Sequence, residues 1–134
     1  MDKLNAMDIC ALSLTTNTII QLWVSWAIHA QQSFIVAKKL ITTWNQMHQQ
    51  AHLGLMQIDV SEQSGDIWDA TLKWLESQKV PDAPQLMYCG AGPLLWIRGG
   101  TIQNVIMNPN STTFDNLMAV TERSFATSNA EKTK

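Results

Sequence analysis

The chain has 134 residues, of which 46% are hydrophobic and 15% are charged, and its formal net charge is −2. This length corresponds to one domain with a core of ordinary size. The nine basic residues are scattered along the chain and are outnumbered by eleven acidic residues, so the sequence lacks the clustered positive charge that nucleic-acid binding requires. We therefore expect no nucleic-acid partner.

The first part of the chain contains an uncharged stretch over residues 9–37, in which only His29 can acquire a charge. The stretch is long enough for a bilayer span, which needs about 20 mainly apolar residues. A polar stripe at helical spacing runs through it, formed by Gln21, Ser25, His29 and Gln32. Two interpretations stay open: a membrane span whose polar stripe bonds to neighbouring helices, or an amphipathic core helix of a soluble protein. The basic pair Lys38 and Lys39 follows and favours a span with the body of the protein on the inner side.

The helical period continues beyond the basic pair through Leu40, Trp44 and Met47, and Gly54 can end the helix. One helix over residues 17–53 would be roughly 55 Å long at about 1.5 Å per residue, which is long for a small soluble domain. The sequence therefore predicts three parts. They are an N-terminal helical or transmembrane segment over residues 1–53, a small α+β domain over residues 54–125 and a disordered tail over residues 126–134.

A strand followed by a helix opens the second part. Residues 55–60 alternate between apolar and polar side chains, which is typical of a half-buried strand, and residues 61–65 are rich in turn-forming types. A helix is predicted over residues 66–78, with Asp66 as its N-cap and Asp69 complementing the helix dipole. Its apolar face carries Ile67, Trp68, Thr71, Leu72, Trp74 and Leu75. Pro81 and Pro84 then predict a loop.

The last third of the chain is predicted to be rich in strands. Residues 85–89 read as a short strand, and residues 90–93 as a turn. Residues 112–125 are predicted to form a final helix, with a strand as the alternative. Together with the first two parts, this pattern predicts an α+β fold.

A hairpin is predicted between these two segments, with Gly99-Gly100 joining strands over residues 94–98 and 101–107. Glycine tolerates the positive φ angles that a two-residue primed turn demands. The register of such a hairpin pairs Ile97 with Ile102 and Leu94 with Val105.

Motifs for catalysis or cofactor binding are weak throughout the chain. His48 and His52 have the spacing of two metal ligands on one helical face, but Gln49 stands where a zinc protease carries its glutamate. Gly90-Ala91-Gly92 lacks both the third glycine of a dinucleotide loop and the Gly-Lys pair of a nucleotide-triphosphate loop. We therefore expect no enzyme, no bound metal and no cofactor.

The cysteines and tryptophans leave further alternatives. Cys10 and Cys89 are 79 positions apart, which favours two unpaired buried thiols over a bridge. The chain has six tryptophans, whose default role is packing. Trp68, Trp74 and Trp96 are the alternative candidates for exposed anchors that bind a partner protein.

One family resemblance follows from the stretches LMQIDVSEQSGDIWDATLKWL and GAGPLLWIRGG, together with the uncharged segment and its basic pair. This order resembles the N-terminal region of the mitochondrial AAA-type chaperone that translocates the Rieske iron–sulfur protein. The resemblance covers roughly residues 15–110. It implies a membrane span and a β-rich domain that faces the substrate inside a ring-shaped oligomer. The chain has no phosphate loop, so the ATPase activity of that family is not implied.

The sequence thus predicts a non-enzymatic, membrane-anchored module that binds proteins. Its predicted location is the mitochondrial inner membrane, and its predicted partners are further copies of itself or an AAA-type ring. The alternative is a soluble self-assembling structural protein of viral or phage type, which the low charge and an interaction-sized apolar surface would suit.

Overall fold

The computed structural model describes residues 17–48, 53–61 and 65–125. These residues form a four-stranded mixed sheet with four α-helices and one short 3₁₀ helix, so the α+β fold class is confirmed. The elements in chain order are β1 (Thr18–Trp23), α2 (Ile28–Met47), β2 (Gly54–Asp59), α3 (Asp66–Ser77), α4 (Ala83–Tyr88), β3 (Leu94–Arg98), β4 (Thr101–Ile106), η1 (Pro109–Ser111) and α5 (Phe114–Phe125).

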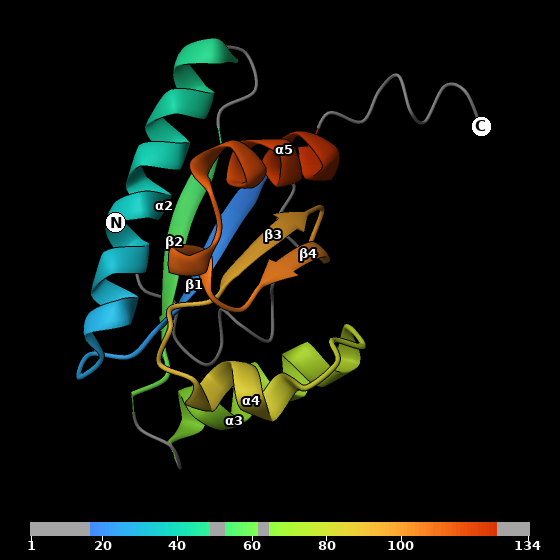
Figure 1. Cartoon of the computed structure of the whole chain (residues 1–134). Helices are drawn as coiled ribbons and strands as arrows, with labels where there is room; N and C mark the ends of the chain where they lie inside the picture. The colour runs from blue at the N-terminus through green and yellow to red at the C-terminus, as the bar shows by residue number, and fades with distance from the viewer. Residues whose placement is uncertain (1–16, 49–52, 62–64, 126–134) are drawn as a thin grey trace.

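The strands lie in the order β2-β1-β3-β4. β1 and β2 run parallel and are joined through α2, whereas β3 is antiparallel to β1, and β4 is antiparallel to β3. Helices cover both faces of the sheet (Figure 1). α2 and α5 pack on one face and α3 and α4 on the other, which produces three layers.

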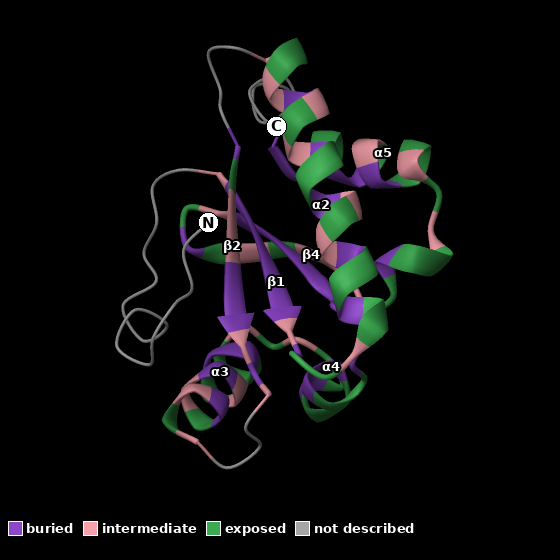
Figure 2. Ribbon diagram, turned by 90° about the vertical axis from the view of Figure 1, so that its left-hand side faces the viewer, coloured by how far each residue is buried: buried purple, intermediate pink, exposed green. Residues whose placement is uncertain are grey.

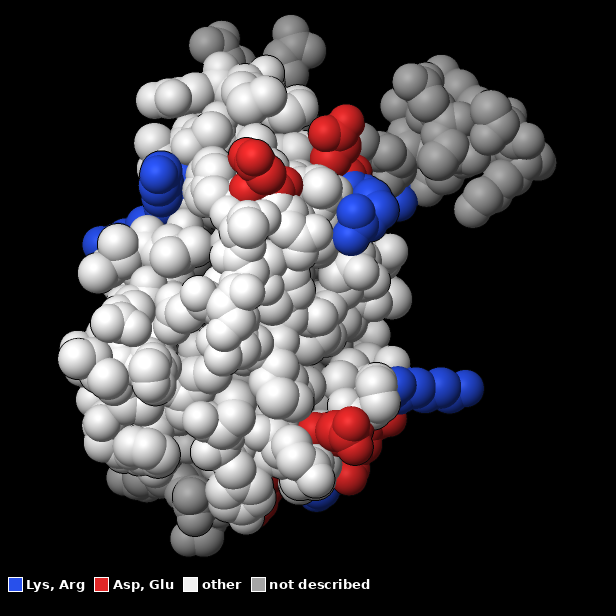
Figure 3. Space-filling view, in the orientation of Figure 1, with Lys and Arg blue, Asp and Glu red and all other residues white. Residues whose placement is uncertain are grey.

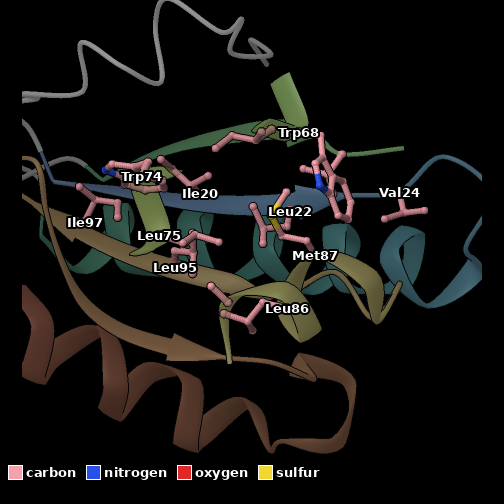
Figure 4. Close-up of a cluster of buried hydrophobic side chains, with 13 residues drawn as sticks. Ile20, Leu22, Val24, Trp68, Trp74, Leu75, Leu86, Met87, Leu95 and Ile97 are labelled. Carbon is pink, nitrogen blue, oxygen red and sulfur yellow. The ribbon is translucent and has the colours of Figure 1, made fainter. Parts of the chain in front are cut away.

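Two hydrophobic clusters hold these layers together, one on each face of the sheet. The first packs α3 and α4 against the strands, with Trp68, Leu75 and Met87 among its members (Figure 4). The second packs α2 and α5 against the other face, with Leu40, Trp44 and Leu117 among its members. β1 contributes to both clusters, and burial is concentrated in the two central strands, β1 and β3, and on the inner helix faces (Figure 2).

The prediction of one helix over residues 17–53 is wrong, because Thr18–Trp23 forms the strand β1 and only Ile28–Met47 is helical. β1 lies in the middle of the sheet, so both of its faces are buried and Ile19, Ile20 and Leu22 are fully enclosed. A strand buried on both faces has a continuous apolar sequence instead of an alternating one, which resembles the sequence of a buried helix. No helix in the described part of the chain has the length and apolar content of a membrane span.

One sheet extends across the predicted boundary at residues 53/54. β1 and α2 lie before it, yet β1 pairs with β2 over six residues and with β3 over four. The sheet of the predicted second domain is therefore completed by a strand from the predicted first segment. The predicted tail, residues 126–134, lies outside the described residues.

Predictions for the second half of the chain are mostly confirmed. β2, α3, the hairpin of β3 and β4, and α5 lie within one or two residues of their predicted positions. Gly99 and Gly100 have φ angles of 60° and 79°, as a primed turn requires. The N-cap prediction is wrong, because Gly65 precedes the helix without a side-chain cap and Asp66 is its first residue.

The predicted strand over residues 85–89 is also wrong, because Ala83–Tyr88 forms the helix α4. Pro84 lies in the first turn of this helix. An N–H in the first turn has no intrahelical acceptor, so a proline there breaks no hydrogen bond of the helix.

The hairpin register is predicted correctly only near the turn. Ile97 pairs with Ile102, but Leu94 pairs with Ile106 and not with Val105. A β-bulge between Trp96 and Ile97 shifts the pairing of β3 with β4 by one residue.

Candidate partner-binding surface

One end of the sheet brings together loops that are far apart in the sequence. β1 and β2 both end there, α2 begins there, and the loop of residues 89–93 leads from α4 into β3 (Figures 1 and 2). The Leu22 N–H donates to the Pro93 carbonyl at 3.0 Å, and the Asn110 side-chain amide donates to the His29 carbonyl at 2.9 Å. In open sheets with parallel strands, ligands commonly bind beyond the carboxyl ends of the strands. We call this region the loop end.

The loop end exposes bulky apolar side chains. Trp26 is 65% exposed, Ile28 is 62% exposed and Tyr88 is 53% exposed. A Cβ placed on Gly90 would lie 3.6 Å from the Trp26 ring and 3.2 Å from the Ala27 Cβ, so the two loops are in contact. The Tyr88 ring packs against the buried Trp68 ring, and the two ring centroids are 4.8 Å apart. We refer to Trp26, Ile28 and Tyr88 as the Trp26 patch.

The part of the loop end formed by the loop after β1 and the start of α2 carries no formal charge. No residue from Asn17 to Ala37 has a formal charge, and this range includes the loop after β1 and the first half of α2. The surface over the first turns of α2 is uncharged at lower left in Figure 3. Interface centres in protein complexes are likewise depleted of charge and enriched in Trp and Tyr.

The first turn of α2 adds backbone donors to this surface. Its N-cap, Ala27, has no side chain that can accept a hydrogen bond, and the first turn holds no acidic residue. The first N–H groups of a helix have no intrahelical acceptor. Those of α2 can therefore donate to carbonyl oxygens of a bound protein segment.

The tryptophans predicted as partner anchors lie elsewhere. Trp68 and Trp74 are on the buried face of α3, and Trp96 is fully buried in β3. The Trp96 indole N–H donates to the Thr121 hydroxyl at 2.9 Å, which ties the sheet to α5. Their burial favours the packing role that the sequence also allowed.

The residues of the Trp26 patch were not singled out as binding residues by the sequence. Trp26 and Ile28 fall within the predicted helix over residues 17–53, and Tyr88 within the predicted strand over residues 85–89. The usable signal is Ser25-Trp26, a polar residue and a tryptophan directly after the apolar run of β1. That signal becomes readable only once β1 is known to end at Trp23.

The remaining candidate residues give no assembled site. His48 ends α2 and stacks on Trp44 with ring centroids 3.8 Å apart, while His52 lies outside the described residues. Among the residues that the structure describes, no three metal-ligating side chains gather. Cys89 is an exposed free thiol, so the prediction of burial is wrong for it, and Cys10 lies outside the described ranges.

Comparison with known proteins adds no relative: no protein-family model matches the chain, and no curated protein matches it.

Proposed function

We propose that this chain is a non-enzymatic protein-binding module whose partner docks on the loop end through an uncharged, apolar segment. The observation that carries the proposal is the exposure of Trp26, Ile28 and Tyr88, the first two of which lie in a stretch of the chain without charge. Burying such side chains against a partner removes apolar area from water, at about 25 cal/mol for each Å². An uncharged partner segment fits because a charged one would lose hydration there without gaining a counter-charge.

The start of α2 lacks the thiols of one class of redox enzymes. A βαβ unit followed by an antiparallel hairpin and a helix resembles the thioredoxin fold, although a shared fold does not imply a shared function. Thioredoxin-like redox motifs place a Cys-x-x-Cys pair at a helix N-terminus, where the thiols are activated. The first turn of α2 and its N-cap instead read Ala27-Ile28-His29-Ala30, which provides no thiol.

The membrane anchor and the mitochondrial chaperone stay predictions. The uncharged stretch that suggested a span is divided between β1 and α2. The proposal therefore keeps the protein-binding role and draws nothing from the ring partner or the inner membrane. Self-assembly likewise stays a prediction, which light scattering on the full chain would test.

The test of the proposal uses peptides selected from a random dodecapeptide phage library on the immobilised full chain. Selected peptides are synthesised and titrated against the wild type and against Trp26→Ala. Met47→Ala is the matched control, because Met47 is as exposed as Trp26 but lies at the far end of α2. We expect Trp26→Ala to weaken binding at least about tenfold, the loss typical of an aromatic hot spot, and Met47→Ala to leave it unchanged.

Two results would contradict the proposal. One is a library that yields no enriched peptide. The other is an equal affinity of the selected peptides for the wild type and Trp26→Ala. Circular dichroism of each variant establishes that a lost affinity is not a lost fold.

A further inference from the structure

The loop that carries Gly90 and Gly92 lies directly on α2 and β1. A Cβ added to Gly92 would come within 2.8 Å of the Gln21 side-chain nitrogen, 2.8 Å of the Ser33 Cβ and 2.9 Å of the Ala30 Cα. Only glycine permits so close an approach, and its φ of +70° independently favours glycine. The position of this loop is therefore set by contacts with the first two turns of α2.

Ser33 makes the polar connection between α2 and the loop. Its side chain is fully buried, and its hydroxyl donates to the Gly92 carbonyl at 2.6 Å, across 59 positions of sequence. Helical Ser and Thr residues commonly donate to a carbonyl of their own preceding turn. Thr71, Thr121 and Ser124 do so in this chain. The Ser33 hydroxyl instead donates to a carbonyl of a separate segment.

Gln21 secures the same helix turn from the sheet. It is fully buried in β1, and its side-chain amide donates to the Ala30 carbonyl at 2.8 Å. Its carbonyl oxygen accepts from the Gln57 amide of β2 at 3.0 Å. Breaking a hydrogen bond between buried groups destabilises the fold, because each group then stays away from water without a partner.

We infer that Ser33, supported by Gln21, is a positioning residue for the Trp26 patch. It holds the loop of residues 89–93 against α2 and so fixes the distance between Trp26 and Cys89. Neither Ser33 nor Gln21 is exposed, so neither can touch a partner. The effect of Ser33 on partner affinity rests on the proposed function, whereas its effect on loop position does not.

The test measures loop position through Cys89, which is an exposed free thiol. A bimane fluorophore is attached to Cys89 in the full chain, in which Cys10→Ser leaves Cys89 as the labelled thiol. The Trp26-dependent quenching is the difference in bimane fluorescence between this chain and the same chain with Trp26→Phe. Removing the hydroxyl with Ser33→Ala should abolish most of this Trp26-dependent quenching. Unchanged quenching would overturn the inference.

The matched control is Ser124→Ala, which removes another buried serine hydroxyl, on α5. It should lower the free energy of unfolding by a similar amount without changing the quenching. An equal loss of quenching in both variants would mean a general loosening and would also overturn the inference. If Ser33→Ala does not fold, Gln21→Met is measured in the same way, with the same criterion.

A second readout separates this inference from the proposed function. Ser33→Ala should lower the affinity for the peptides selected on the wild type about five- to tenfold, which corresponds to roughly one hydrogen bond. If Trp26→Ala loses affinity while Ser33→Ala retains both affinity and quenching, the proposed function stands and the inference fails. If Ser33→Ala loses quenching but no peptide binds the wild type, the positioning role stands and the proposed function fails.

Discussion

Among single residues, the tryptophans show how one residue type takes opposite roles. Trp96 is in a central strand, and Trp68 and Trp74 are on the inner face of a helix, so all three are buried. Trp26 follows β1 by three residues and projects beyond the sheet, where it is exposed. The side chain is the same in each case, and its position relative to other elements determines its burial.

Two glycines provide a prediction at the residue scale. Gly92 and Gly99 have φ angles of +70° and +60°, but a Cβ on Gly92 would meet three atoms within 3 Å, whereas one on Gly99 would meet nothing within 4 Å. Gly99→Ala should therefore cost about 1–2 kcal/mol of unfolding free energy for its backbone conformation alone. Gly92→Ala should cost at least about 1–3 kcal/mol more, because the loop must move away from α2.

Urea unfolding followed by circular dichroism measures both variants. Equal losses for Gly92→Ala and Gly99→Ala would show that the loop is not packed tightly on α2. They would also weaken the argument for Ser33 as a positioning residue.

For whole elements, predictability followed the exposure of each segment. β2 is an edge strand, and it alternates between apolar and polar side chains, so its period is visible. β1 is a central strand, and its mainly apolar residues show no alternation that would distinguish a strand from a helix. Tertiary packing decided between a strand and a helix for β1.

The N-terminus of α2 gives a prediction at the element scale. Its N-cap, Ala27, has extended φ and ψ angles, which suit a capping residue, but it lacks a side-chain acceptor. Ala27→Ser should stabilise the protein by about 1 kcal/mol, because the serine hydroxyl can accept from a first-turn N–H.

The control for this prediction is Gly65→Ser at the N-cap of α3, which also lacks a side-chain cap. Its gain should be only a few tenths of a kcal/mol, since glycine is itself a tolerated N-cap. Urea midpoints measure both variants. A loss of stability on Ala27→Ser would contradict the geometry assigned to this helix start.

At the scale of the whole molecule, the described residues share one sheet and two hydrophobic clusters. β1 pairs with both β2 and β3, and the two hydrophobic clusters each draw on segments before and after residue 53. Removing the segment before residue 54 would open the centre of the sheet and expose both clusters.

A truncated chain tests whether the parts before and after residue 53 fold as one unit. A fragment of residues 54–125 should lack the near-ultraviolet circular dichroism of packed aromatic rings, because it loses β1 and α2. The full chain should unfold in one cooperative transition with the same midpoint by tryptophan fluorescence and far-ultraviolet circular dichroism. Independent folding of the fragment would instead restore the domain boundary predicted from the sequence.

The sequence by itself determined the elements whose signals are local. Alternation specified β2, two adjacent glycines specified the hairpin turn, and a helical apolar period specified α3 and α5. It also determined the absence of charge in the loop after β1 and the first half of α2, since residues 17–37 carry none.

Only the tertiary structure decided that β1 is a strand, which tryptophans are buried and where the Trp26 patch lies. Each of these depends on contacts between segments that are distant in sequence, such as the one between Ser33 and Gly92. A local pattern records how a segment alternates between water and core, but not which other segment covers it. For that physical reason the candidate site appeared only with the assembled fold.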